Sequence, residues 1–340
     1  MTADDEFEQV ALPLRRELVA YCYRMTGSID EAEDLAQETF LRAWRSYGTF
    51  EGRSSLRTWL YRIATNVCLG AIERRDHRPL PSGLGPSSDD PGGAFSAPAL
   101  DVPWLQPFPS DGADPGGADP AAIVASRAGL RLALIASLQY LPPRQRAVLI
   151  LRDVLDWPAA DTARMLGMTA TAVNSALRRA RARLEQVDPA ADDVAEPADR
   201  RDRDAASRYA AAFQDADLTA LVALLRADVA AEMPPMREWF RGAQVVGRFL
   251  ATRVLTGPGR FTLIPVEANG QPAFGTYLRA GDGQWAAHAI QVLDIADGRV
   301  TRISMFLDTG LFRAFGLPPM VPAAAPPILA QAMPAQAGRG

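Results

Sequence analysis

The chain contains 340 residues, 36 basic and 40 acidic, which is more than one hydrophobic core normally organises, so two or three domains are expected. Its two cysteines, Cys22 and Cys68, lie in helical patterns and match neither a disulfide framework nor a zinc site, which indicates a reducing compartment. The start lacks a signal segment and no run is long enough to cross a membrane, so a cytoplasmic protein is expected. The sequence contains no P-loop and no dinucleotide-binding fingerprint.

The amino-terminal quarter is predicted to form three helices. Apolar residues at helical spacing mark the first over 7–25 and the third over 56–71. Between them, Ser28 and Glu31 form a capping-box pattern for a helix over 29–46. Three amphipathic helices in succession predict a helical bundle.

Two faces of this bundle could bind other molecules. Acidic and polar residues on the second helix would usually be a solvated face, but Leu41 among them favours a protein-binding surface. On the third helix, Tyr61, Arg62 and Thr65 are expected to point away from the bundle, with Asn66 at the boundary. Aromatics interleaved with arginine suit melted nucleic acid, although helices with a tryptophan core and basic ends are common.

Residues 78–120 are rich in Pro, Gly, Ser and Asp and are predicted to be a flexible linker. A coil of this length spans roughly 35 Å on average and can stretch well beyond 100 Å. Within it, the segment 102–111 is too apolar for a plain spacer. We expect an extended docking peptide, and a locally collapsed hydrophobic cluster is the alternative.

A helix-turn-helix pattern follows over 141–184. Pro142 and Pro143 open a helix, and Gly167 allows a tight turn before the last helix. That helix has an apolar stripe that must face inward, which leaves Asn and Arg side chains outward, where they suit base edges and phosphates. Residues 121–186 hold ten arginines and four acidic residues, which points to nucleic acid. A solvated basic helix end is the alternative.

The last third is predicted to begin with helices over 205–225 and 245–255. Strands are then expected over 261–268, 273–279, 285–295 and 300–307. Asn-Gly and Asp-Gly pairs between them are strong hairpin signals, so we expect a curved antiparallel meander.

Three stretches together closely resemble an extracytoplasmic-function (ECF) sigma factor of the sigma-70 family. They are DEAEDLAQETFLRAWRSYGTF, SLRTWLYRIATNVC and LPPRQRAVLILRDVLDWPAADTARMLGMTATAVNSALRRARARL. The last third is similar in architecture to the SnoaL-like cone of the nuclear-transport-factor-like fold. The resemblance implies a multidomain protein with two all-α sigma domains and an α+β cone. The expected divisions are 5–77 (region 2), 78–120 (linker), 121–186 (region 4), 187–203 (linker), 204–317 (SnoaL-like domain) and 318–340 (disordered tail).

The resemblance implies a factor that binds core RNA polymerase and promoter DNA and initiates transcription. It implies no enzymatic activity, cofactor or metal of its own. The residues implied for core binding, at the β′ clamp helices, are Asp34, Gln37, Glu38, Leu41 and Trp44. A second contact, with the β flap, is implied as well.

The resemblance also assigns the DNA contacts, on two promoter elements about two turns of DNA apart, on the order of 70 Å. Those implied for the −10 element are Phe50, Arg62, Asn66, Arg74 and Arg75. Those implied for the −35 element are Thr169, Thr171, Asn174, Ser175, Arg178, Arg179 and Arg181. Because several relatives carry Arg at the position of Asn174, the −35 sequence itself does not transfer from them.

The role of the cone stays open. We expect it to modulate the sigma domains through intramolecular contact. Trp104, Leu105 and Phe108 of the linker are expected to dock on the cone or on the polymerase. Alternatively, the cone binds a small ligand as a sensor or keeps an isomerase-like or cyclase-like activity. The residues expected to line its pocket are Trp239, Tyr277, Trp285, His288 and Asp294. For His288, a half-buried strand position is the simpler interpretation. A second alternative for the whole chain is a stand-alone helix-turn-helix repressor.

Overall fold

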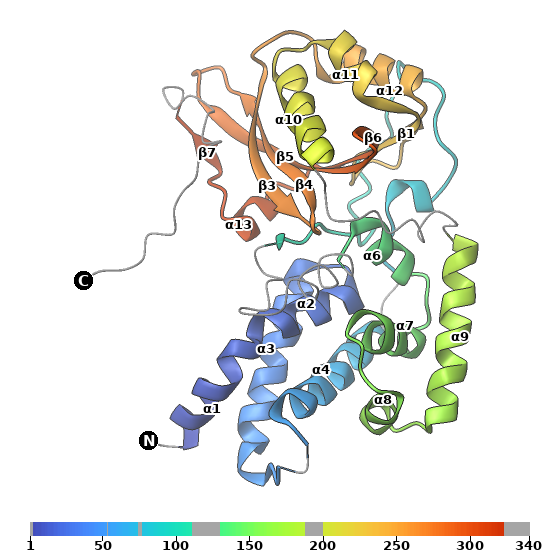
Figure 1. The fold of residues 1–340 in the computed structure, drawn as a ribbon. Coiled ribbons are helices and arrows are strands. Elements are labelled where there is room, and N and C mark those ends of the chain that lie inside the picture. The colour runs from blue at the N-terminus through green and yellow to red at the C-terminus, as the bar shows by residue number, and fades with distance from the viewer. Residues whose placement is uncertain (1–2, 53, 74–76, 111–129, 188–199, 323–340) are drawn as a thin grey trace. The chain divides into compact units, whose positions relative to one another are not determined.

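The computed structural model describes residues 3–52, 54–73, 77–110, 130–187 and 200–322 (Figure 1). The chain forms two compact units. Unit 1 contains Met1–Pro79 and Pro103–Val194, and unit 2 contains Leu80–Val102 and Ala195–Gly340. Segment 80–102 therefore leaves unit 1, packs within unit 2 and returns. Among the described residues, no helix combines the length and the apolar composition needed to cross a bilayer.

The amino-terminal part of unit 1 is helical, as predicted. Its elements are α1 (Ala3–Ala11), the 3-10 turn η1 (Leu12–Leu14), α2 (Arg15–Thr26), α3 (Ile29–Ser46), η2 (Tyr47–Thr49) and α4 (Leu56–Ile72). The single helix predicted over 7–25 is interrupted at Pro13, because proline lacks the N–H that a continuous helix needs. Gly27, at φ 72°, ends α2, and the Ser28 side chain accepts a hydrogen bond from the backbone N–H of Glu31 to begin α3.

The second part of unit 1 contains the predicted helix-turn-helix. Its elements are α6 (Leu132–Leu138), α7 (Pro143–Leu149), the π-helical turn η5 (Ile150–Val154), α8 (Ala159–Leu166) and α9 (Ala170–Val187). Gly167, at φ 62°, ends α8. The buried stripe predicted on α9 is confirmed for Val173, Leu177 and Ala180, and α9 packs on α7 and α8 through this side.

The orientation predicted for two α4 residues was wrong. Tyr61 and Thr65 were expected to point away from the bundle, yet both are fully buried. The reason is tertiary: α7 and α8 pack on this side of α4. Arg62 and Asn66, on the other side, are exposed.

The described part of the linker, 77–110, differs from the coil predicted over 78–120. Its carboxyl-terminal portion lies on unit 1, where the Leu105 N–H donates to the Pro79 carbonyl at 3.1 Å and closes the base of the loop formed by 80–102. The other portion, 80–102, packs in unit 2: the Ala99 N–H donates to the Pro235 carbonyl at 2.9 Å. Composition indicates that this segment has no core of its own, and the partners that order it belong to other elements.

Unit 2 combines helices with a mixed sheet (Figure 1). Its elements are α10 (Arg200–Gln214), α11 (Leu218–Leu224), β1 (Leu225–Glu232), β2 (Trp239–Arg241), α12 (Ala243–Phe249), η6 (Leu250–Val254), β3 (Phe261–Ala268), β4 (Gln271–Arg279), β5 (Trp285–Ala296), β6 (Arg299–Phe306), α13 (Leu311–Ala314) and β7 (Met320–Val321). The strand order is β2-β1-β6-β5-β4-β3, with β7 paired to β5.

The four predicted strands are confirmed, but the sheet is not a simple antiparallel meander. Strands β3 to β6 pair antiparallel through hairpins, two of which turn at Asn269-Gly270 and Asp297-Gly298 with positive φ. Strand β1 was not predicted, and it pairs parallel to β6. Parallel pairing requires a long crossover, which here contains β2, α12 and β3 to β5.

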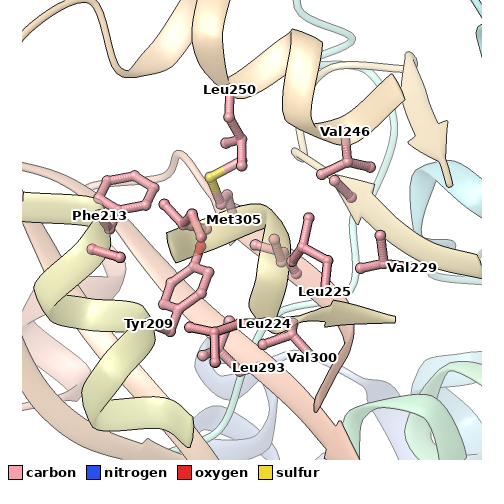
Figure 2. Close-up of a cluster of buried hydrophobic side chains, with 14 of the residues drawn as sticks. Tyr209, Phe213, Leu224, Leu225, Val229, Val246, Leu250, Leu293, Val300 and Met305 are labelled. Carbon is pink, nitrogen blue, oxygen red and sulfur yellow. The ribbon is translucent and has the colours of Figure 1, made fainter. Parts of the chain in front are cut away.

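The core of unit 2 lies between the sheet and helices α10 to α12 (Figure 2). Figure 2 shows Tyr209 and Phe213 of α10 directed at Leu293 and Met305 of the sheet. Leu250 and other apolar side chains complete the same cluster. Burying an aromatic and aliphatic cluster of this kind stabilises a domain in proportion to the apolar area removed from water. The unit therefore has the means to fold around its own core.

We predict that Gly27→Ala destabilises the protein by about 2 to 4 kcal/mol, whereas Gly52→Ala costs about 1 kcal/mol. Both glycines have positive φ, which alanine adopts at a cost. At Gly27 the added Cβ would also lie 2.6 Å from Cδ1 of Leu105, whereas nothing lies within 4 Å at Gly52. Thermal unfolding followed by circular dichroism would compare the two variants. Equal losses would contradict close packing of the linker on the α2–α3 corner.

Candidate nucleic-acid interface

Helix α9 presents a polar outer face. Thr171, Asn174, Arg178 and Arg179 are exposed, and Ser175 is half-buried. The Thr169 hydroxyl accepts a hydrogen bond from the Ala172 N–H at 3.1 Å, so Thr169 caps the helix. Amide and guanidinium groups on one exposed helix face can pair with adenine and guanine edges in a major groove. Most of the residues predicted for the −35 element therefore share one accessible face.

Arg181, which was predicted in the same set, has a partner within the protein. Its Nε and Nη2 donate to the two carboxylate oxygens of Asp153 at 2.8 and 2.7 Å. This bidentate hydrogen bonding raises the pKa of Arg181. The pair ties α9 to the η5 turn. In this arrangement Arg181 braces the helix that carries the exposed polar face.

The residues predicted for the −10 element lie along α4 and before it. The Phe50 ring packs on Trp59 with centroids 4.9 Å apart, and Asn66 lies two helical turns further along α4, about 10 Å. Arg62 is exposed. Arg74 and Arg75 lie outside the described residues.

Asn66 also borders a hollow of about 320 Å³ between α3 and α4. The residues that line it are Leu35, Glu38, Arg42, Asn66, Val67, Gly70 and Ala71. An apolar floor with amide, carboxylate and guanidinium groups at the rim can hold a flat polar ring. The hollow is large enough to admit such a group.

The polymerase-binding residues predicted on α3 form an exposed strip. Leu41 and Trp44 are 40% and 48% exposed, and Asp34 and Gln37 are exposed beside them. Glu38 accepts a hydrogen bond from Arg42 at 2.7 Å, one turn along the same helix. The opposite side of α3, including Ala36, is buried in the bundle. Large apolar side chains amid carboxylates on one helix face are typical of a protein-docking surface.

The linker segment with Trp104, Leu105 and Phe108 was expected to dock on the cone or on the polymerase, and in the structure it packs on region 2, within unit 1. Leu105 and Phe108 are buried, Trp104 is half-buried, and the Phe108 ring stacks on Tyr23 with centroids 4.6 Å apart. Gln106, between them, was not singled out from the sequence. Its side-chain oxygen accepts hydrogen bonds from the Ser28 hydroxyl at 2.7 Å and the Ile29 N–H at 2.9 Å. The linker thus adds a second cap to α3.

The residues predicted to line a pocket in the cone are not brought together. Trp239 donates to the Gly85 carbonyl at 2.9 Å, and the buried Tyr277 donates to the Pro318 carbonyl at 2.9 Å. Trp285 lies beneath the Arg279 guanidinium, 5.7 Å from its ring centroid. Each of these contacts belongs to a different part of unit 2. Their arrangement is that of packing residues.

His288 and Asp294 also have separate surroundings. The His288 ring lies 5.5 Å from Phe261, and burial followed by the charge of Arg260 lowers its pKa. Asp294 accepts a hydrogen bond from Gln271 at 2.6 Å. Neither residue is placed with the other as an acid–base pair.

A buried carboxylate that the sequence did not reveal connects segment 80–102 to the sheet of unit 2. Glu232 is fully buried and accepts hydrogen bonds from Arg302 at 2.8 Å, Ser304 at 3.2 Å and the Ser82 N–H at 3.2 Å. Ser82 belongs to the linker. A single glutamate in an Ala-rich run gives no sequence signal of this role.

Three family models match the chain. They are Sigma-70 region 2 over residues 12–78, Sigma-70, region 4 over residues 131–184, and a SnoaL-like domain over residues 206–303. These matches cover the α2–α4 bundle, the helix-turn-helix and most of unit 2.

Relatives extend over nearly the whole chain. It is 50% identical over 315 residues to the ECF RNA polymerase sigma factor SigG of Mycobacterium tuberculosis, covering 92% of this chain and 84% of the relative. It is 29% identical over 297 residues to SigJ of the same organism, covering 84% and 87%. The crystal structure of SigJ matches with a TM-score of 0.62 at 26% identity, covering 92% of this chain and 99% of SigJ. The chain therefore belongs to the ECF RNA polymerase sigma factors of the sigma-70 family and carries a SnoaL-like domain after region 4.

Proposed function

We propose that this sigma factor docks on core RNA polymerase through the exposed strip of α3 and reads the −35 element with α9. In the same proposal, it holds the −10 element along α4, and its SnoaL-like domain modulates both contacts. The observation that carries the proposal is the face of α9. It follows a glycine turn, has a buried apolar stripe and exposes Asn174, Arg178 and Arg179 together.

Family membership assigns the general role of a sigma factor. The individual surfaces support separate parts of that role. Asn pairs with adenine and Arg with guanine, so the face of α9 suits sequence reading at the −35 element. The α3–α4 hollow beside Asn66 suits an extruded base, whose unstacking costs a few kcal/mol that a fitted pocket can offset. Phe50 and Trp59 provide an aromatic surface at the start of the same helix.

The α3 strip is suited to core polymerase because it combines two large apolar side chains with acidic neighbours. Leu41 and Trp44 would lose water on docking, and Asp34 would face basic groups of a partner. The caps supplied by Ser28 and Gln106 fix the beginning of this helix. A rigid helix presents such a strip at lower entropic cost than a loop does.

Modulation by the SnoaL-like domain is supported by the contacts that this domain makes with the linker. Arg253 donates to the carbonyls of Gly92 and Gly93, both at 2.6 Å, and its guanidinium lies 5.5 Å from the Phe95 ring centroid. Phe95 in turn packs edge-on against Phe240 and Phe249, at 6.1 and 6.2 Å. The loop begins and ends on region 2, so this hold joins the SnoaL-like domain to region 2 as well as, through the chain, to region 4.

A catalytic role for the SnoaL-like domain gains no support from its interior. Apolar side chains of the cluster in Figure 2 lie between the sheet and the helices. The residues expected in a pocket are engaged elsewhere. We therefore assign the domain to regulation.

We predict that Arg179→Ala weakens binding to the cognate −35 element by about 1 to 3 kcal/mol and lessens discrimination at one base pair. Binding of the reconstituted polymerase to promoters with single −35 substitutions would measure both effects. Arg164→Ala serves as a control because that exposed arginine lies on α8. A uniform loss on every sequence would reassign Arg179 to a phosphate contact.

We expect Trp44→Ala to lower the affinity for core polymerase at least tenfold, because a large apolar side chain in a docking surface often dominates its free energy. Folding should be unchanged, since Trp44 is 48% exposed. Leu12→Ala, at a position 57% exposed in η1, is the matched control. Binding of labelled protein to core polymerase is the measurement, and equal affinities for the two variants would contradict the assignment.

Arg253→Ala should release the loop and change the transcription rate from the cognate promoter. Arg248→Ala, an exposed arginine on the neighbouring turn, should change neither. Amide hydrogen exchange of residues 88–96 would report the release, and run-off transcription would report the rate. A released loop with an unaltered rate would show that holding the linker has no regulatory effect.

A further inference from the structure

Segment 88–96 of the linker lies on unit 2 as an extended peptide lies in a binding groove. The Ser88 N–H donates to the Trp239 carbonyl at 2.8 Å, and Ser88 pairs with Phe240 as a parallel bridge. Strand β2 comes first in the strand order, so the segment adds to an edge of the sheet. Addition of an extended segment to a sheet edge is a common mode of peptide recognition.

One aromatic side chain anchors this segment. The Phe95 ring lies edge-on to the rings of Phe240 and Phe249, with centroids 6.1 and 6.2 Å away. Those two rings are buried and stack on each other at 4.7 Å. Phe95 is half-buried and packs through them on the apolar cluster of unit 2. The groove therefore has a socket for a single ring, between β2 and α12.

Arg253, on η6, holds the backbone that precedes the ring. Its Nη2 donates to the carbonyls of Gly92 and Gly93, both at 2.6 Å. Both acceptors are main-chain atoms, so Arg253 recognises the path of the backbone. A Cβ at Gly93 would lie 2.9 Å from Oδ2 of Asp90, which favours glycine in this turn. The groove thus selects a glycine turn with an aromatic residue two positions later.

Glu238 binds the residue that follows the ring. Its Oε1 accepts hydrogen bonds from the Ser96 N–H at 2.8 Å and from the Ser96 hydroxyl at 2.5 Å. Its Oε2 is buried and lacks a hydrogen-bond partner among the residues that the structure describes. A buried acceptor without a partner opposes burial. Segment 88–96 therefore leaves one acceptor of the groove unsatisfied, and a ligand with a further donor at this position would bind more tightly.

These contacts recognise a short pattern and do not require a covalent connection. The edge pairing, the two carbonyls bound by Arg253, the ring and the contact with Glu238 all lie within segment 88–96. A separate chain with the same pattern can make each of them. The tether gives the resident segment an effective concentration in the millimolar range. A free ligand must therefore bind more tightly than the resident or wait until the resident leaves.

We propose that the edge of β2, with the socket formed by Phe240, Phe249 and Arg253, is a peptide-binding groove that segment 88–96 occupies when no partner is bound. The partner is a protein with an extended segment that carries a glycine turn, an aromatic residue two positions later and a hydrogen-bond donor directly after it. The inference goes beyond the proposed function, because it makes unit 2 a receptor for a separate protein.

Binding of a synthetic peptide tests the groove. The probe is a fluorescein-labelled peptide with the sequence of residues 86–97. The receptor is the full-length chain in which segment 88–96 is replaced by an equally long stretch of Gly and Ser. This emptied chain keeps the length of the linker and lacks the anchoring ring. Fluorescence anisotropy measures the affinity, and circular dichroism checks the fold.

We expect the emptied chain to bind the probe at least tenfold more tightly than the unmodified chain, in which the resident segment competes. A probe with Phe95→Ala should bind about tenfold more weakly. In the emptied chain, Arg253→Ala should weaken binding by a similar factor, whereas Arg248→Ala, at an exposed position on α12, should not. No binding to a folded emptied chain, or equal affinities for the two probes, would overturn the groove.

A single substitution keeps the test decisive if the replacement unfolds the protein. Phe95→Ala in the full-length chain removes only the anchor of the resident segment, so this variant should bind the probe several-fold more tightly than the unmodified chain. Equal binding by the two chains would overturn the groove. These assays contain neither polymerase nor DNA. Their failure would leave the proposed sigma function standing, and a loss of promoter-directed transcription would leave the groove standing.

Discussion

The backbone hydrogen bond between Leu105 and Pro79 determines the path of the linker. Leu105, Gln106 and Phe108 pack on region 2 beside it. Because this hydrogen bond returns the linker to region 2, segment 80–102 becomes a closed loop. Unit 2 holds this loop through backbone and arginine contacts. The SnoaL-like domain therefore contacts a segment of chain that starts and ends at region 2, and the chain also links this domain to region 4.

Three helices of the sigma regions, α3, α4 and α9, each have one buried side and one exposed side. Helix α3 buries Ala36 and exposes Leu41, and α4 buries Tyr61 while exposing Asn66. Helix α9 buries Val173 and exposes Asn174. Core packing on one side fixes the rotation of each helix, and this rotation orients the functional side chains on the other. A core substitution would therefore act on binding as well as on stability.

Local signals in the sequence predicted local structure well. The cap at Ser28, the turn at Gly167 and the hairpin at Asn269-Gly270 depend on neighbouring residues, and each was found where it was expected. Strand β1 was missed because its Ala-rich sequence favours a helix, and pairing with β6 overrides that preference.

Contacts between distant residues could not be read from patterns. Tyr61 is buried by a helix about a hundred positions away, and Arg181 is held by Asp153 across the helix-turn-helix. The linker was predicted to be a coil because composition does not reveal partners elsewhere in the chain. The exposed polar face of α9 was accessible to prediction, since helical periodicity alone separates its two sides.

As an ECF sigma factor, this chain is expected to direct core polymerase to promoters defined by two separated elements. The most direct measurement reconstitutes the purified full-length chain with core polymerase, transcribes genomic DNA fragments and sequences the transcript starts. We expect transcript starts preceded by a shared pair of motifs about two DNA turns apart, and these starts should disappear when the chain is omitted. No association with core polymerase, or starts identical to those of core polymerase alone, would contradict it.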